Sequence, residues 1–290
     1  MNIGIIGLGL IGGSLALASK KYTLGSRCYG RDINTTHVKQ ALTLGIIDEE
    51  LTDAKLPQMD IVILAVPVDI ACELVLTLLD NLNDNALVMD VGSTKAGICE
   101  RVSVHPKRNQ FLATHPIAGT EFSGPSAAYP ELFLEQTQIL CETSFTRPDL
   151  LEWALQWFRS MSMRIKEMDP KAHDQHIAYV SHLSHVSSFM LGKTVMEKEK
   201  DERAIFDMAG SGFASTVRLA KSSPSMWTPI FKQNRENLLE VLTEYIENLS
   251  AFKNDLEQQH YDQLYQTMEA TNAIRSILAG INENNTKNNN

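Results

Sequence analysis

His115 is the residue of this sequence whose type and surroundings are best suited to chemistry. It lies in the segment THPIAGT, residues 114–120, directly after the apolar run Phe111–Ala113. An imidazole has a pKa near neutrality and can accept the proton of an alcohol while hydride leaves the same carbon. Pro116 and Gly119 keep a helix from enclosing it. A hydrogen-bonded histidine packed in the core is the alternative, and we expect the catalytic role.

A glycine-rich segment near the start of the chain indicates the cofactor that this histidine would serve. Residues 7–12, GLGLIG, have the GxGxxG spacing between a strand-like run and a helical pattern. We expect Gly7 to make a tight turn, Gly9 to let a pyrophosphate approach the backbone, and Gly12 to let the helix pack closely on the strand. The pyrophosphate would lie at the N-terminus of that helix. The predicted cofactor contacts here are Gly7, Leu8, Gly9, Leu10, Ile11 and Gly12.

The second strand-like run ends in a residue that distinguishes two nicotinamide cofactors. Asp32 follows Gly12 by 20 residues, a position from which a carboxylate binds the adenosine ribose hydroxyls and repels a 2′-phosphate. We therefore expect NAD as the cofactor. Arg31 beside it keeps NADP open as the alternative, because an arginine could accommodate the extra phosphate. Val66 and Pro67 follow the third apolar run and are expected to border the cofactor, with ordinary strand-end packing as the other interpretation.

The elements that must position these residues alternate between strands and helices in the first half of the chain. Such alternation is typical of a doubly wound α/β fold, whose ligands bind at the carboxyl ends of parallel strands. We predict helices at Leu10–Lys20 and Val68–Leu79. His115 would then lie at a strand end, at the same edge as the glycine-rich turn. The predicted strands are Asn2–Gly7, Ser26–Asp32, Asp60–Val66, Ala86–Val91, Phe111–Thr114, Thr137–Cys141 and Met163–Met168.

The pattern changes after Pro170, beyond which strand signals stop and helical patterns run from about 171 to 200 and from 228 to 281. We predict an N-terminal doubly wound Rossmann-type NAD-binding domain at residues 1–169, followed by an all-helical substrate and dimerisation domain at residues 170–281. Residues 282–290, mostly asparagine, have no apolar side chains to bury and are expected to form a disordered tail.

The last helical stretch carries an apolar seam that predicts a homodimer. Its members recur at spacings of four and three, and further apolar residues widen the face beyond one seam. A helix that is apolar over so wide an arc must be enclosed by other helices. We expect a second copy of the chain to enclose it, with an intramolecular bundle as the alternative. The seam consists of Leu238, Leu242, Tyr245, Leu249, Phe252 and Leu256.

Composition excludes several classes of function. The chain has 290 residues, 43% of them hydrophobic, and a net charge of −9 without a basic stripe, which argues against a nucleic-acid partner. No apolar run reaches the roughly 18 residues of a membrane span, so we expect no membrane partner. The first residues, MNIGII, indicate a strand and not a signal peptide. The four cysteines are scattered and indicate reduced thiols in the cytoplasm. They are Cys28, Cys72, Cys99 and Cys141.

Several of these motifs occur together, and in the same order, in prephenate dehydrogenases. They are GLGLIG at 7–12, DVGSTK at 90–95, HPIAGTE at 115–121, SHLSH at 181–185 and GF at 212–213 with Arg218. The chain resembles that family over nearly its whole length up to the asparagine-rich tail. The resemblance implies NAD-dependent oxidative decarboxylation of prephenate to 4-hydroxyphenylpyruvate in tyrosine biosynthesis, by a two-domain enzyme with a helical dimerisation domain.

The resemblance also implies roles for individual residues. Ser93 would orient His115 and contact substrate or nicotinamide, although it could instead cap the following helix. Arg218 would bind a substrate carboxylate, His185 would help to hold the substrate, and His182 would line the cleft between the domains. Glu121 would reach the substrate side chain or regulate access. Trp227 resembles a family tryptophan that reaches into the neighbouring subunit's site. The substrate-binding set is thus Arg218, His185, His182, Glu121 and Trp227.

Two positions depart from the family pattern. Ser184 occupies a position that is often proline, and Ser215 occupies one that is often aspartate. An acidic group at position 215 could choose between a pyruvyl and an amino-acid side chain. Arogenate dehydrogenase, which carries out the same ring chemistry on the aminated substrate, therefore stays open as the alternative function.

Three further interpretations have less support in the sequence. A metal site formed by His173 and His176 with the two later histidines is not expected, because on a continuous helix the two pairs fall on opposite sides and no cysteine pattern accompanies them. A β-hydroxyacid dehydrogenase would need a catalytic lysine, for which Lys193 is the one candidate in the helical part. A non-catalytic NAD-sensing protein would bind cofactor without turnover.

Overall fold

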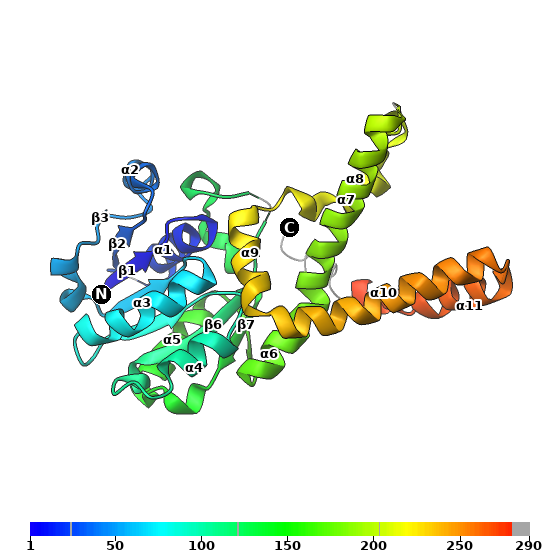
Figure 1. Cartoon of the computed structure of the whole chain (residues 1–290). Helices are drawn as coiled ribbons and strands as arrows, with labels where there is room; N and C mark the ends of the chain where they lie inside the picture. The colour runs from blue at the N-terminus through cyan, green and yellow to red at the C-terminus, as the bar shows by residue number, and fades with distance from the viewer. Residues whose placement is uncertain (24, 121, 203, 280–290) are drawn as a thin grey trace. The chain divides into compact units, whose positions relative to one another are not determined.

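An eight-stranded sheet runs through the N-terminal half of the chain in the computed structural model, which describes residues 1–23, 25–120, 122–202 and 204–279 (Figure 1). Each of the seven predicted strands is present within two residues of its expected start, so the prediction of strands at these runs is confirmed, although the edge strand β8 is largely exposed and not buried. The strands are β1 (Asn2–Ile6), β2 (Arg27–Arg31), β3 (Glu49–Glu50), β4 (Ile61–Leu64), β5 (Leu87–Asp90), β6 (Phe111–Ile117), β7 (Thr137–Cys141) and β8 (Arg164–Glu167).

The order of the strands is β3-β2-β1-β4-β5-β6-β7-β8. Neighbouring strands are parallel, except that β6 and β7 run antiparallel with His115 opposite Ile139. From β3 to β6 this is the order of a Rossmann-type sheet, in which the winding reverses between β1 and β4. The glycine-rich turn follows β1 and Val66 follows β4, so both flank the point at which such sheets bind their ligand.

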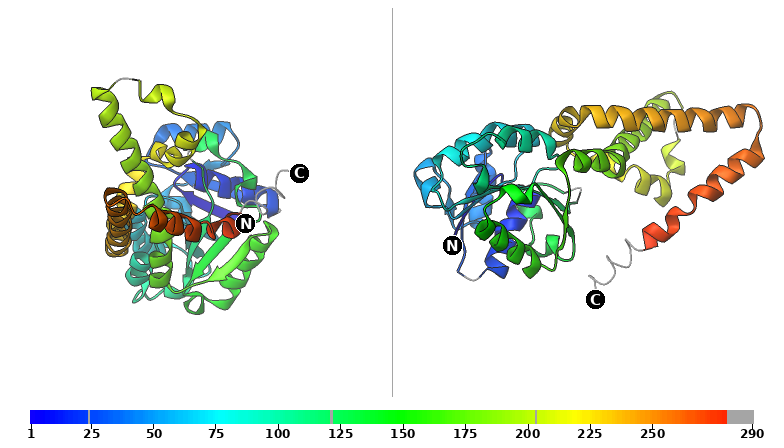
Figure 2. Two further views of the ribbon diagram at one scale, coloured as in Figure 1. Left: turned by 90° about the vertical axis from the view of Figure 1, so that its right-hand side faces the viewer. Right: turned by 90° about the horizontal axis from the view of Figure 1, so that it is seen from below.

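Helices lie on both faces of the sheet, as a doubly wound fold requires (Figures 1 and 2). One core contains apolar side chains of α1, α2 and α5, including Leu15, Val38 and Trp157. The other contains side chains of α3 and α4, including Val75 and Ile98. Removing apolar surface from water at about 25 cal/mol per Å² stabilises this arrangement. The helices are α1 (Leu10–Tyr22), α2 (Thr35–Thr43), α3 (Val68–Asn81), α4 (Ala96–Val102) and α5 (Pro148–Ser160).

The helical half of the chain starts with a well-defined cap. The Asp169 carboxylate accepts hydrogen bonds from the backbone nitrogens of Lys171 and Ala172, at 2.9 and 3.0 Å, and Pro170 occupies the first helical position. Helix α6 (Pro170–Ile177) passes through a π-helical turn (Ala178–His182) into α7 (Leu183–Asp201). Helices α8 (Ser211–Thr216) and α9 (Pro224–Gln233) follow, with the short 3-10 helix Arg218–Lys221 between them.

The chain divides into two compact units, residues 1–235 and 236–290. The first contains the sheet and helices α1 to α9. The second contains nearly all of α10 (Arg235–Glu257) and α11 (Tyr261–Thr271). The predicted division into domains at residue 170 marks the change from strands to helices and stays a prediction. The predicted tail, 282–290, and the end of the expected helix at 281 lie outside the described residues.

Parts of the expected secondary structure need correction. β6 ends at Ile117 and not at Thr114, because residues 113–117 pair with β7. The two-residue edge strand β3 was not predicted, since it carries no apolar alternation. The stretch expected to be helical from 228 is interrupted near Asn234 and again between α10 and α11.

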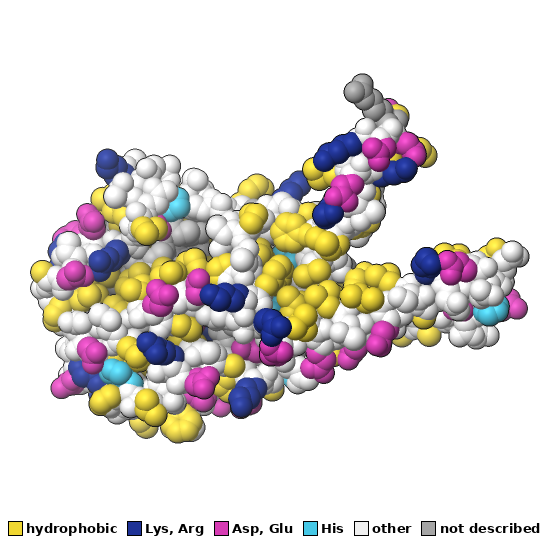
Figure 3. Space-filling view, viewed as in Figure 1, with side chains coloured by type: hydrophobic (Ala, Val, Ile, Leu, Met, Phe, Trp, Pro, Cys, Tyr) yellow, Lys and Arg dark blue, Asp and Glu magenta, His cyan; other side chains and the backbone are white. Residues whose placement is uncertain are grey.

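The second unit exposes several large apolar side chains. Of the predicted seam, Leu238 is buried, whereas Leu249, Phe252 and Leu256 are exposed by 52, 40 and 50%. Figure 3 shows hydrophobic side chains gathered on these helices. Exposed apolar area of this kind is typical of a surface that another chain covers. No helix in the described part of the chain combines the length and apolar character that crossing a membrane requires.

Candidate active site

Two of the glycines in the predicted cofactor turn are required by local geometry. Gly7 has φ of +95°, a conformation that residues with a Cβ rarely adopt. A methyl group at Gly12 would lie 1.9 Å from the carbonyl oxygen of Gly7, so α1 can start this close to β1 only with glycine there. The turn therefore folds tightly and brings the start of α1 to the carboxyl edge of the sheet.

Gly9 is different, because it faces open space. A methyl group built on it would meet nothing within 4 Å among the described atoms. Gly9 is also the N-cap of α1, and no described side chain caps this helix. The amide groups of the first turn of α1 are thus available for an anion, and the helix dipole favours one. The bare surface over these amides fits a pyrophosphate, with Leu8, Leu10 and Ile11 beside it.

Asp32 is held against this turn. Its Oδ2 accepts a hydrogen bond from the Leu8 nitrogen at 2.8 Å, and its Oδ1 accepts one from the Asn34 nitrogen at 2.8 Å. Arg31, in contrast, is exposed, and its guanidinium binds Asp53 Oδ1 at 2.6 Å. A fixed carboxylate beside the turn is suited to ribose hydroxyls, and its charge disfavours a nearby phosphate.

The loop after β4 lies beside the same turn. A Cβ at Gly7 would be 3.1 Å from Val66 Cγ1, so Val66 borders the glycine loop directly. Pro67 is exposed and serves as the N-cap of α3. Both predicted residues therefore lie at the switch point of the sheet, where the cofactor is expected.

His115 lies in the part of β6 that extends past the end of β5. The last residue pair between these strands is Asp90 with Ala113, so His115 has no neighbour on that side of the sheet. The side chain is partly buried, and its Nδ1 lies 2.8 Å from Nε2 of His173 on α6. Burial, followed by the nearby charges of His173, Lys95 and His182, holds the pKa of His115 well below its usual 6.5. The imidazole is therefore neutral at working pH and able to accept a proton.

His173 is itself held by the next residue in the chain. Its Nδ1 lies 2.8 Å from Oδ1 of Asp174. The Asp174 carboxylate also accepts hydrogen bonds from the backbone nitrogens of Lys95, at 2.7 Å, and Ala96, at 2.9 Å. Because these amides start α4, Asp174 caps that helix from a distant part of the sequence.

This cap corrects one expectation for Ser93. The N-cap of α4 is Lys95, and Asp174 supplies the capping carboxylate, so Ser93 does not cap the helix. Ser93 is partly buried in the loop between β5 and α4, at the same edge as His115. The Nδ1 of His115 contacts His173 and not this serine. The role expected for Ser93 at the reaction centre stays a prediction.

A buried ion pair lies under this loop. The ammonium of Lys95 contacts the carboxylate of Asp90 and the carbonyl oxygen of Thr114, the latter at 2.7 Å. Burial is the main effect on the Asp90 carboxyl and raises its pKa. A buried charge is tolerated only when it is paired, and this pair connects the β5 end to the residue before His115.

His182 is completely buried in the π-helical turn. Its Nδ1 lies 3.1 Å from Nδ2 of Asn234, which also donates to the carbonyl oxygen of Asp174 at 2.7 Å. Burial lowers the pKa of His182 to about 4. Its Nε2 has no hydrogen-bond partner among the described residues, and neither does Nε1 of Trp227. Buried donors without a partner cost about 1–3 kcal/mol each, so both N–H groups lack the compensation that an acceptor would give.

His185 and Trp227 form a stacked pair near these donors. Their ring centroids are 3.5 Å apart with an interplanar angle of 26°, and His182 lies edge-on to the same indole at 5.8 Å. Burial lowers the pKa of His185, and the charge of Arg218 lowers it further, which places that guanidinium near the stack. Trp227 is 6% exposed and stacks on His185 of its own chain, and the expectation that it reaches a neighbouring subunit's site stays a prediction.

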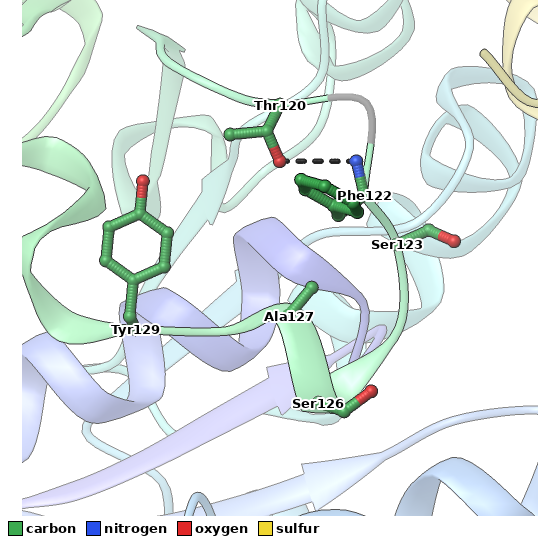
Figure 4. Close-up of a pocket in the computed structure, with 6 residues that line it drawn as sticks. All are labelled: Thr120, Phe122, Ser123, Ser126, Ala127 and Tyr129. Atoms are coloured by element: carbon green, nitrogen blue, oxygen red, sulfur yellow. Dashed lines mark hydrogen bonds between the residues drawn. The ribbon is translucent and has the colours of Figure 1, made fainter. Parts of the chain in front are cut away.

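A surface cavity of about 780 Å³ lies along the loop between β6 and β7 (Figure 4). Thr120 Oγ1 accepts a hydrogen bond from the Phe122 nitrogen at 3.3 Å within it. Tyr129, also in its lining, donates its backbone N–H to Ser14 Oγ on α1, which ties the loop to the helix after the glycine turn. Glu121 lies outside the described residues. The cavity lining is Thr120, Phe122, Ser123, Ser126, Ala127 and Tyr129.

Two of the other interpretations of the sequence concern a metal site and a catalytic lysine. Among the described residues, no three His, Cys, Asp or Glu side chains are grouped so that they could hold a metal ion. Lys193, the candidate for a β-hydroxyacid dehydrogenase, is exposed and pairs with Glu197 at 2.5 Å on the surface of α7. The structure instead brings His115, His182, His185 and Trp227 into one region of unit 1.

Sequence reasoning did not identify His173 and Asp174 as part of the site. The sequence weighed His173 only as a metal ligand, whereas the structure places it against His115. The available signal was the capped start of α6 at Asp169-Pro170, which fixes the position of a buried histidine one turn later. Asn234 was not identified either, because its partners are 52 and 60 residues away.

Two family models match the chain over adjoining segments. The model described as "Prephenate dehydrogenase, nucleotide-binding domain" matches residues 15–167. The model described as "Prephenate dehydrogenase, dimerization domain" matches residues 169–270.

Individual relatives show the same similarity. A prephenate dehydrogenase of Bacillus subtilis is 32% identical, covering 96% of this chain and 76% of the relative. A crystal structure of prephenate dehydrogenase from A. aeolicus with hydroxyphenyl propionate and NAD+ is 30% identical with a TM-score of 0.88, covering 96% of this chain and 98% of that one. Arogenate dehydrogenase of Synechocystis is 27% identical with a TM-score of 0.76, covering 95% and 99%.

Proposed function

Because the chain belongs to the prephenate dehydrogenase family, we propose that it catalyses the NAD-dependent oxidative decarboxylation of prephenate to 4-hydroxyphenylpyruvate, a step of tyrosine biosynthesis. One observation carries this proposal beyond the family match. A neutral imidazole, that of His115, lies at the same sheet edge as the glycine-rich turn, so a base and a dinucleotide site occur together.

The residues of the turn fit NAD. The bare Gly9 surface and the free amides of α1 receive the pyrophosphate, and the fixed Asp32 carboxylate receives the adenosine ribose. A bound NAD supplies the hydride acceptor for the oxidation. The structural relative from A. aeolicus holds NAD+, which supports the same cofactor here.

His115 acts as the base of the reaction. It accepts the proton of the ring hydroxyl as the carbon that bears this hydroxyl loses hydride, so that an O–H bond breaks and an N–H bond forms. Loss of the ring carboxylate as carbon dioxide then passes its bonding electrons through the ring to the new carbonyl oxygen, so the ring becomes aromatic and the resulting phenolate takes up a proton from water. Aromatisation drives this step without any Lewis acid.

The polar groups around His115 bind the substrate. Arg218 pairs with one carboxylate, for which a guanidinium offers two parallel N–H donors. The partnerless N–H groups of His182 and Trp227, next to His185, offer further donors to an acceptor atom. Ser93 lies on the loop next to this region. Glu121 is assigned to the substrate side chain by the family resemblance alone.

The test is a direct assay of NADH formation from NAD and prephenate. We expect turnover with prephenate and release of one carbon dioxide for each NADH formed. NAD binding without any turnover would contradict the proposal and favour the NAD-sensing alternative. Arogenate is the second candidate substrate, because the chain is similar to the arogenate dehydrogenase of Synechocystis. A higher kcat/KM with arogenate than with prephenate would replace the first assignment by the second.

The assembly we propose is a homodimer through the C-terminal helices. A second copy of the chain would bury the exposed apolar side chains of α10, which include Phe252 and Leu256. The matching family model is described as a dimerization domain. Sedimentation of the full chain should give a mass of two copies. Phe252→Lys together with Leu256→Lys should shift it toward one copy, and a wild-type monomer at micromolar concentration would contradict the dimer.

The cytoplasm is the location we propose for this enzyme. Burial raises the pKa of the Cys28 and Cys141 thiols to about 12 and also raises that of Cys99, so these buried thiols stay protonated and unreactive. Fractionation of cells that produce the chain should find it with the cytoplasmic enzymes.

A further inference from the structure

We propose that His173 and Asp174 are positioning residues that fix the tautomer of His115, so that its Nε2 carries the lone pair that accepts the substrate proton. The inference rests on the proposed function, because it names the groups that prepare the base of that reaction. It depends on a chain of hydrogen bonds that connects three side chains from β6 and α6 to the start of α4.

The donor and acceptor in each of these hydrogen bonds follow from the carboxylate at the end of the series. Asp174 already accepts the N–H groups of Lys95 and Ala96, and an ionised carboxylate can only accept. The proton between Asp174 and His173 must therefore belong to Nδ1 of His173. A neutral imidazole with its proton on Nδ1 has a lone pair on Nε2, and this lone pair faces His115.

The position of the proton on the His115 ring is fixed in the same way. Because Nε2 of His173 accepts, Nδ1 of His115 must donate across the 2.8 Å between them. Neutral His115 then has no proton on Nε2, which is the nitrogen left for the substrate. His173 and Asp174 are 2 and 4% exposed, so water does not compete for these bonds. Asn234 holds the Asp174 carbonyl oxygen at 2.7 Å and fixes the backbone of the pair.

The arrangement also prepares the product of proton transfer. When Nε2 of His115 takes the proton, the ring becomes an imidazolium, and its Nδ1–H still donates to His173. That bond becomes charge-assisted and therefore stronger, with the negative charge of Asp174 one ring further away. A single proton moves in this step, from the substrate hydroxyl to His115, and Asp174 stays ionised. His173 and Asp174 thus stabilise both the neutral form of His115 that accepts the proton and the imidazolium that results.

Asp174 connects this chain to the loop that carries Ser93. The carboxylate caps the first amides of α4, and Ser93 lies two residues before the first of them. One side chain therefore sets the position of the β5–α4 loop relative to His115. A variant of Asp174 would disturb both, so the test needs a readout that reports the tautomer itself.

Nitrogen-15 NMR of the full-length protein labelled in histidine provides this readout. His115→Asn and His173→Gln variants assign the signals. We expect a protonated Nδ1 and an unprotonated Nε2 for both His115 and His173, at a pH above 6.5, the ordinary pKa of histidine. A protonated Nε2 on His115, or a doubly protonated His173, would overturn the inference. The measurement needs no turnover, so it succeeds or fails independently of the substrate assignment.

A pair of variants at position 173 tests the consequence for catalysis. His173→Leu removes the acceptor for the His115 proton and should lower kcat by roughly 10–100-fold, the usual effect of losing such a supporting group. His173→Gln offers a carbonyl oxygen near the former Nε2 and should recover most of that loss. The KM for NAD should stay within about twofold in both. His176→Gln, an exposed histidine on the same helix, is the matched control and should behave as wild type.

Asp174→Asn tests the direction of the chain. Its amide can donate to His173, which would reverse both hydrogen bonds and put the proton of His115 on Nε2. We expect a loss of kcat on the order of 100-fold or more, with that protonation visible in the spectrum.

Equal losses of kcat in the Leu and Gln variants of His173 would show a purely structural role. An unchanged kcat in His173→Leu would remove His173 from the machinery. If wild type fails to oxidise prephenate while the predicted tautomer is observed, the proposed function fails and not the hydrogen-bond chain.

Discussion

The ammonium of Lys95 lies 2.7 Å from the carbonyl oxygen of Thr114, the residue directly before His115. The contact places the ammonium of a buried ion pair, whose other member is Asp90, under the strand that carries the proposed base. Together with burial and the rings of His173 and His182, it lowers the pKa of His115. A base that has to accept a proton is useful only while it is neutral, so this environment extends its working range toward acid.

The pH dependence of kcat/KM should show this shift. His115 is active when unprotonated, so activity is complete above its pKa and is lost as the pH falls through it. We expect the acid limb for prephenate to lie below pH 6.5, the ordinary value. Replacing the pair, with Lys95→Met and Asp90→Asn together, removes the charge and should move the limb toward higher pH. A wild-type limb at or above 6.5 would contradict the environment described.

Gly9 and Gly12 should respond differently to alanine. A methyl group at Gly12 clashes with the Gly7 carbonyl oxygen, so Gly12→Ala should lower the free energy of unfolding by about 2 kcal/mol or more. Gly9→Ala meets no described atom and should change stability by less than about 1 kcal/mol. The affinity for NAD should nevertheless fall at least about tenfold, because the methyl group occupies the path of the pyrophosphate. Calorimetric titration with NAD and thermal unfolding separate the two effects, and unchanged NAD affinity in Gly9→Ala would place the cofactor elsewhere.

Asp32 should control the choice of cofactor. Asp32→Ala removes the carboxylate that holds the Leu8 amide and repels a 2′-phosphate, so the ratio of kcat/KM for NAD over NADP should fall by about tenfold or more, equivalent to about 1.4 kcal/mol. Asp53→Ala is the matched control, since this exposed carboxylate pairs with Arg31 and not with the turn. It should leave the affinity for NAD unchanged. An unaltered ratio in Asp32→Ala would show that this residue does not select the cofactor.

Arg218 should act on substrate binding. Arg218→Ala should raise the KM for prephenate, by an amount corresponding to about 2 kcal/mol or more if the carboxylate pair is shielded from water. Lys221→Ala removes an exposed cation from the same short helix and should change KM by less than about twofold. Steady-state kinetics at saturating NAD measure both. A KM that stays constant in Arg218→Ala would exclude the guanidinium from the site.

The fold was predictable because its signals are local. Buried parallel strands are short apolar runs, and the glycine turn requires its residue types for reasons that hold in any chain, as Gly7 and Gly12 show. The sequence predicts the end of β6 at Thr114, because the apolar run stops at Ala113. Pairing with β7 carries the strand past Pro116 to Ile117.

The arrangement around His115 was less predictable, because it depends on long-range contacts. His173 approaches His115 only because α6 starts at the Asp169 cap and packs beside α4. The positions of the histidines around the helix axis also differ from those expected for a continuous helix. A π-helical turn at Ala178–His182 interrupts the regular helix, and no residue type announces it. The sequence could therefore name His115, His182 and His185 without showing which of them touches which neighbour.

Hydride transfer in His115→Asn tests the central claim most directly. NADH formation would be followed with saturating prephenate and NAD, and calorimetric titration would verify that the variant still binds NAD. We expect a kcat lower by roughly 10²–10⁴-fold with NAD affinity unchanged, since the proton of the hydroxyl then lacks its acceptor. A kcat within a few-fold of wild type would contradict it and place the base on another residue.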